Sequence, residues 1–192
     1  RQFGDFDPGV WYTNPLSGIQ TRTSSTMEHN DFLRRVRVAL DLNDAEVLAL
    51  LNEPDGQWTK NDLTALFPKR GQRARRACSA ALLLRFLDNL ITARRGPRGS
   101  GAAPAAPAPT ALTNNTLIKK LRIALNYREA DVIEAMKRGG MILSPSQVKT
   151  LFRKEGHKHY RECTDQILRI FLSGVATLTR DPHREAAPAN AP

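Results

Sequence analysis

The chain has 192 residues, with 29 Lys and Arg against 19 Asp and Glu, so its formal net charge is +10. Its apolar runs fall short of the about 18 residues that a membrane-spanning helix needs, and its N-terminus lacks the layout of a secretory signal. Two cysteines do not make a disulfide framework, so we expect a cytoplasmic protein that contacts no membrane.

Residues 1–26 contain four aromatic residues among Gly, Pro, Asp and Thr, with neither helical nor alternating periodicity. We expect this N-terminal lead to be extended or disordered. Met27 follows it directly, and the sequence leaves open whether Met27 is the natural start.

The rest of the chain contains one sequence twice. Residues 30–90 align with residues 115–175 without gaps, at a fixed offset of 85 residues. The shared apolar positions indicate a common core. One repeat of about 65 residues would bury only about 60% of its unfolded surface, so we expect the two copies to stabilise each other by packing together.

Repeat one, residues 27–95, is predicted to form four helices. They begin near Asn30, Asn43, Thr59 and Ser79, and Asn43 forms a capping box with Glu46. A Pro/Ala-rich stretch, residues 96–111, follows and is expected to be a semi-extended linker.

Repeat two, residues 112–180, is predicted to form the same four helices. Asn115 is a plausible cap for the first, and Gly139-Gly140 ends the second. Ser144 begins the third with Pro145 in its first turn, and Thr164 begins the fourth. No segment alternates like a strand, and residues 181–192 are expected to be a disordered tail. The predicted fold is all-α: two homologous four-helix repeats packed as a pseudo-symmetric pair.

The most basic segment is the loop of residues 153–161, called the basic loop below. Its Lys and Arg side chains would neutralise phosphates, Gly156 would let backbone N–H groups approach them, and Tyr160 would stack on a base. The alternative is a solvated loop between two helices, with Tyr160 folded into the core. Repeat one keeps basic residues in its equivalent loop, including Lys69 and Arg76.

A second basic row lies on the first helix of each repeat, with Arg34, Arg35 and Arg37 aligned with Lys119, Lys120 and Arg122. This row would extend a phosphate-binding stripe, or it is an ordinary solvent-facing helix surface. Because Arg37 and Arg122 are identical in both copies, one of them could instead pair with a carboxylate inside its own repeat. The candidate nucleic-acid-binding residues are therefore Arg34, Arg35, Lys69, Arg76, Lys119, Lys120, Arg122, Arg153, Lys154, His157, Lys158, Tyr160 and Arg161.

Other patterns are weaker. Residues 129–153 loosely resemble a helix–turn–helix with a reading helix over residues 146–154, but a plain helical hairpin fits better. His157, His159 and Cys163 lack a fourth zinc ligand, and the recurring cysteine is interpreted as a core residue. No phosphate-binding loop, nucleophile elbow or carboxylate pair is present, so we expect no metal, no cofactor, no small-molecule substrate and no enzymatic activity.

Three segments of repeat two resemble the YehS-like family of bacterial proteins: residues 113–115, 120–125 and 152–163. That family consists of tandem copies of a domain of unknown function, and the resemblance covers residues 27–95 and 112–179. Repeat one departs from the pattern in its loop, where residues 71–76 lack the His and Tyr of repeat two. The resemblance implies the tandem architecture but no catalytic residues.

Charge is unevenly divided between the repeats. Residues 27–95 carry 12 basic and 9 acidic side chains, whereas residues 113–180 carry 13 and 6. This distribution favours a polyanionic partner for repeat two. We therefore expect non-enzymatic binding of nucleic acid, RNA ahead of DNA, through phosphate contacts. The alternative is a protein-interaction module that docks on an acidic protein.

Overall fold

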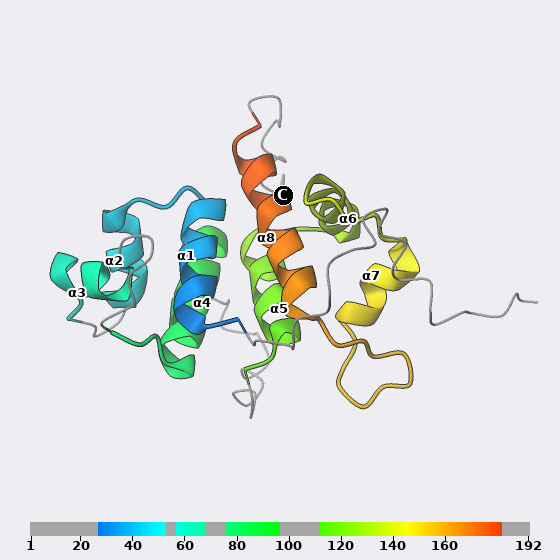
Figure 1. Ribbon diagram of the computed structural model, residues 1–192, viewed down its shortest axis with the longest axis horizontal. Coiled ribbons are helices and arrows are strands. Elements are labelled where there is room, and N and C mark those ends of the chain that lie inside the picture. The colour runs from blue at the N-terminus through cyan, green and yellow to red at the C-terminus, as the bar shows by residue number, and fades with distance from the viewer. Residues whose placement is uncertain (1–26, 53–56, 68–75, 97–111, 182–192) are drawn as a thin grey trace, which may run out of the picture.

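The computed structural model describes residues 27–52, 57–67, 76–96 and 112–181. These ranges form helices and contain no strand, which confirms the predicted all-α class (Figure 1). The helices are α1 (His29–Ala39), α2 (Asp44–Asn52), α3 (Lys60–Leu66), α4 (Ala80–Arg95), α5 (Asn114–Ala124), α6 (Glu129–Arg138), α7 (Pro145–Leu151) and α8 (Asp165–Thr179). Residues 1–26, 97–111 and 182–192 lie outside the described residues. They make up the expected lead and all but the first residue of the expected linker (96–111) and tail (181–192).

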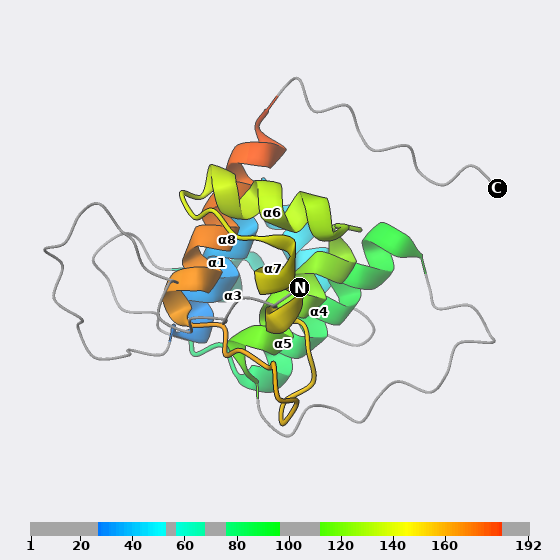
Figure 2. The same ribbon diagram turned by 90° about the vertical axis from the view of Figure 1, so that its right-hand side faces the viewer.

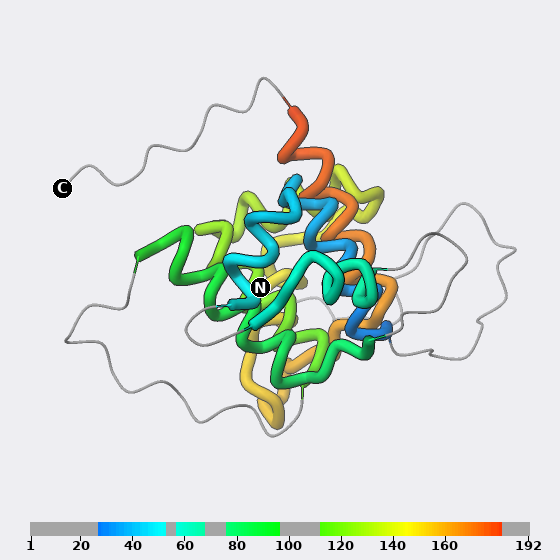
Figure 3. The backbone as a smooth tube through the Cα atoms, turned by 90° about the vertical axis from the view of Figure 1, so that its left-hand side faces the viewer, coloured from blue at the N-terminus to red at the C-terminus, as the bar shows by residue number. Residues whose placement is uncertain are grey.

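The two repeats pack as a pseudo-symmetric pair, as predicted. Repeat one contributes α1 to α4 and repeat two contributes α5 to α8, so α1 corresponds to α5 and α4 to α8. Between the repeats, α4 packs on α5 and α1 packs on α8, which are equivalent contacts when the repeats are exchanged. The pairs α2–α3 and α6–α7 flank this central group at opposite ends (Figure 1); Figure 2 views the end with α6 and α7, and Figure 3 the end with α2 and α3.

The apolar face of each helix supplies the core. Phe32, Phe86 and Phe171 are fully buried. Cys78 and Cys163 are buried free thiols, which confirms their interpretation as core residues. Burial raises the pKa of Cys78 to about 11 and that of Cys163 to about 12, with Asp165 and Glu162 adding to the shift of Cys163.

Most predicted helix ends are confirmed because they depend on local side chains. Thr59, Ser79, Ser144 and Thr164 each accept a hydrogen bond from a backbone N–H of the helix that follows. Gly140 ends α6 in the left-handed conformation, with φ +97°.

One local prediction is wrong. The cap of α5 is Thr113, whose side chain accepts from Thr116 N, and Asn115 lies inside the helix and is buried. The helix after Ser144 ends at Leu151. It is therefore shorter than a reading helix over residues 146–154, and α6 and α7 form the plain helical hairpin that the sequence favoured.

Candidate nucleic-acid interface

The basic loop leaves the end of α7 and returns to the start of α8. Figure 1 shows it as the yellow-orange segment that extends below α7. Its residues from Arg153 to His159 are all exposed. The backbone turns twice, with His157 N donating to Lys154 O at 3.1 Å and Tyr160 N donating to His157 O at 2.7 Å. Gly156 has φ +82°, a conformation that glycine adopts without strain.

The side chains of this loop form a local cationic cluster. Arg153 Nη1 lies 3.2 Å from His157 Nε2, and His157 Nδ1 accepts from the backbone N–H of His159 at 3.1 Å. Desolvation, together with the charges of Arg153, His159 and Lys158, lowers the pKa of His157. Lys154 and Lys158 form no ion pair with any residue that the structure describes. Both ammonium groups are therefore available to an external anion.

A shallow cavity of about 350 Å³ lies between α7 and the basic loop. Its lining includes Lys149, Thr150, Arg153 and His159. Lys149 is 61% exposed and lies 3.6 Å from Glu129, an exposed ion pair that an external phosphate could replace at little cost. Lys149 therefore adds one cation on α7 beside the basic loop.

Tyr160 does not point outward for stacking. It is half-buried, and its hydroxyl donates to Asn115 Oδ1 at 3.0 Å. Desolvation raises its pKa, with Glu155 and Glu162 adding to the shift. The structure thus follows the alternative in which Tyr160 folds inward, and the expected role in base stacking is corrected.

Arg161 is also drawn inward. Its backbone N–H donates to Thr150 O at 3.2 Å, and its carbonyl accepts from the side chain of Asn115 at 2.8 Å. Burial lowers the pKa of its guanidinium group. Arg161 therefore belongs to the anchored end of the loop and is only half-exposed.

Arg122 is held inside its own repeat. Its guanidinium carbon lies 4.7 Å from the centre of the Phe152 ring, and its Nε donates to Tyr127 O at 3.1 Å. Arg37 makes the equivalent contacts in repeat one and also pairs with Asp44. The prediction that Arg122 belongs to an exposed phosphate-binding row is corrected: both arginines stabilise the turn after the first helix of their repeat.

Two other members of the first-helix row, Lys120 and Arg35, are neutralised by carboxylates. Lys120, whose side chain is only 19% exposed, pairs with Asp88 of α4 and so bridges the two repeats. Arg35 pairs with Asp31 at 2.9 Å. The row therefore does not continue the cationic surface of the basic loop. Two of its members form no ion pair with any described residue: Arg34 and Lys119.

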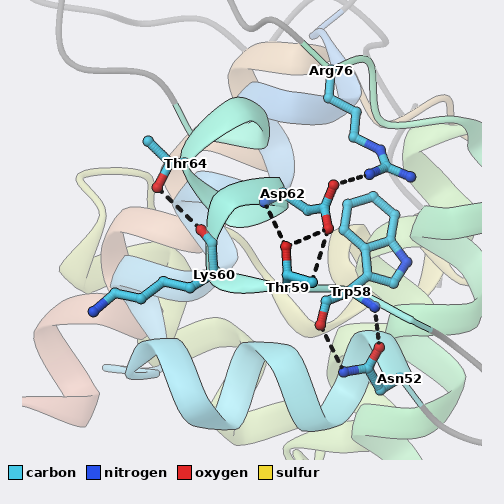
Figure 4. A network of polar contacts seen from close by, with 7 residues as sticks. All are labelled: Asn52, Trp58, Thr59, Lys60, Asp62, Thr64 and Arg76. Atoms are coloured by element: carbon cyan, nitrogen blue, oxygen red, sulfur yellow. Dashed lines mark hydrogen bonds and ion pairs between the residues drawn. The ribbon is translucent and has the colours of Figure 1, made fainter.

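In repeat one, Arg76 is part of a polar network (Figure 4). Its guanidinium carbon lies 4.0 Å from the centre of the Trp58 ring, and it pairs with Asp62. Hydrogen bonds from Thr59 hold the pKa of Asp62 below its usual value, and Arg76 lowers it further. Arg76 is therefore held by contacts inside repeat one. Lys69 lies outside the described residues.

Sequence reasoning missed the role of Asn30 and Asn115. Each lies inside the first helix of its repeat and forms hydrogen bonds to backbone groups more than 30 positions along the chain. The available signal was an identical Asn at equivalent positions, within a helix where Asn has low propensity.

The described residues were searched for a metal site and for a membrane-spanning helix. His157 and His159 are exposed whereas Cys163 is buried, and no group of three or more His, Cys, Asp or Glu in the described ranges could hold a metal ion. Among those same residues, no helix is both long and apolar enough to cross a membrane.

These features define a class: an all-helical protein of two docked repeats, with an exposed basic loop in the second. Both repeats match the family described as "Protein of unknown function (DUF1456)", over residues 29–96 and 114–181, and the chain belongs to that family. It is 32% identical over 150 residues to "Uncharacterized protein YehS" of Escherichia coli (strain K12), which covers 78% of this chain and 95% of that protein. The YehS-like resemblance is thereby confirmed. No solved structure is significantly similar to the chain.

Proposed function

We propose that this protein binds nucleic acid without catalysis, RNA ahead of DNA, through phosphate contacts made by the basic loop. One observation supports the proposal above the others. Arg153, Lys154 and Lys158 lie on one exposed segment of seven positions in which the only acidic residue is Glu155, and neither lysine is neutralised by a described carboxylate. The charge of this surface is therefore available to a polyanion.

The mechanism is electrostatic. Each cation that contacts a phosphate releases a condensed counterion, and each such contact with a single strand contributes about −0.7 to the slope of log K against log salt. Three loop cations would give a slope of about −2, and Lys149 would add to it. RNA is favoured over DNA because α7, the helix next to the loop, has only seven residues and is too short to read a major groove.

The alternative partner is an acidic protein surface. Ile142, in the connection between α6 and α7, is 86% exposed and would offer an apolar contact to such a partner. A protein partner would give complementary charge with a weaker salt dependence than a nucleic acid.

The proposal is tested by removing two loop charges. The variant Lys154→Gln with Lys158→Gln should bind single-stranded RNA about ten-fold more weakly at about 50 mM salt, with a salt slope reduced by about 1.4. A matched control, Lys60→Gln with Lys137→Gln, removes two exposed lysines from other surfaces. It should leave the affinity within about two-fold.

Both double variants should unfold at the wild-type temperature, because all four side chains are exposed. The proposal is wrong if the wild-type protein shows no salt-dependent binding to RNA. Equal losses in the loop variant and in the control would instead mean that net charge matters and the loop does not.

A further inference from the structure

Asn115 holds both ends of the basic loop with one side chain. Its Nδ2 donates to Leu151 O, at the end of α7, and to Arg161 O, at the end of the loop, each at 2.8 Å. Its Oδ1 accepts from Cys163 N at 2.8 Å and from the hydroxyl of Tyr160 at 3.0 Å. At 8% exposure, Asn115 is shielded from water, so these four bonds meet little solvent competition.

In repeat one, Asn30 makes the same three hydrogen bonds to backbone groups, without the tyrosine. Asn30 Nδ2 donates to Leu66 O and to Arg76 O, each at 3.0 Å, and its Oδ1 accepts from Cys78 N at 2.8 Å. Repeat one has Arg75 at the position of Tyr160. We call this set of hydrogen bonds around the asparagine the clamp. Its three backbone contacts are common to both repeats, whereas the tyrosine that makes the fourth hydrogen bond is found in repeat two and not in repeat one.

The chemistry of the clamp requires an amide. Two carbonyls need two donors, while a backbone N–H and a hydroxyl need an acceptor with two lone pairs, and a primary amide supplies both. An aspartate at this position would place a carboxylate oxygen against the carbonyls of Leu151 and Arg161, where nothing donates to it.

From this geometry we infer that Asn115 is the positioning residue of the basic loop. It fixes where the loop starts and ends, so the loop loses conformational freedom on folding and not when it meets a ligand. Tyr160 contributes through its hydroxyl, as a support for the clamp. The effect on RNA binding rests on the proposed function, whereas the ordering of the loop does not.

The test compares Asn115→Ala with Asn30→Ala, because each variant loses the same three backbone contacts. In Asn115→Ala, the amides of Tyr160, Arg161 and Cys163 should exchange their hydrogens at least about ten-fold faster, with the amides of α6 unchanged. RNA binding should weaken about five- to ten-fold even though no charge is lost, and Asn30→Ala should stay within about two-fold of wild type.

A smaller change provides a second measurement. Tyr160→Phe removes one hydrogen bond to Asn115 Oδ1, and it should raise loop exchange about three-fold, with no further increase when it is added to Asn115→Ala. If Asn115→Ala does not fold, the loop exchange rates of Tyr160→Phe alone test the inference.

Wild-type exchange rates at the loop amides, in a folded Asn115→Ala protein or in Tyr160→Phe, would overturn the inference, whatever the RNA result. A wild-type protein that fails to bind RNA would overturn only the proposed function, since the exchange measurement still reports on the clamp.

Discussion

Asn89 of α4 and Gly174 of α8 occupy equivalent positions in the two repeats but meet the neighbouring helix in different ways. Asn89 Nδ2 donates to Leu50 O of α2 at 2.8 Å, so its side chain spans the gap between the helices. Gly174 lies against the carbonyl of Ala135, the residue of α6 equivalent to Leu50, and a Cβ there would overlap that oxygen. Repeat two therefore packs its second and fourth helices backbone to backbone, and Gly139 makes a similar contact with Ile170.

The first prediction concerns this contact. Gly174→Ala should destabilise the protein by about 1–3 kcal/mol, because the added methyl group overlaps backbone that cannot rotate away. Helix propensity alone predicts the opposite sign, a gain of about 1 kcal/mol. Urea unfolding distinguishes the two. The control, Ser173→Ala at the exposed neighbouring position, should change stability by less than about 0.5 kcal/mol.

The second prediction separates structure from binding at Arg122. Arg122→Gln removes the stacking on Phe152 and the hydrogen bond to Tyr127 O, and should cost about 1–2 kcal/mol of unfolding free energy. RNA affinity, measured well below the unfolding temperature, should remain within about two-fold of wild type. Loss of RNA affinity without loss of stability would show that Arg122 contacts the RNA.

The third prediction follows from the lowered pKa of His157. Desolvation, and then the charges of Arg153, His159 and Lys158, oppose a positive charge on its ring. The unfolded chain therefore takes up this proton more readily than the folded one. The contribution of His157 to stability should fall as the pH drops through the ordinary histidine value of about 6.5.

Bound phosphates reverse that preference, since they favour the imidazolium form. RNA affinity should therefore rise between about pH 7.5 and about pH 5.5, more steeply than for His157→Gln. The same pH dependence in wild type and variant would show that other groups cause it.

The fourth prediction concerns the thiols. Because the pKa values of Cys78 and Cys163 are raised to about 11 and about 12, almost no thiolate exists near neutral pH. Both thiols should resist a thiol-specific reagent at about pH 8 in the folded protein and react completely in denaturant. Fast labelling of either cysteine under native conditions would contradict the observed burial.

The sequence alone determined the helical class, the duplication and most helix starts. A cap such as Ser144 acts within one turn of its own helix, and an 85-residue repeat is visible without any structure. The tertiary structure decided which basic residues are available. Lys120 and Asp88 are 32 positions apart, and Asn115 and Cys163 are 48 apart, so no local pattern predicts that they meet. A charge is neutralised by whichever group packing brings beside it, and packing is a property of the whole fold.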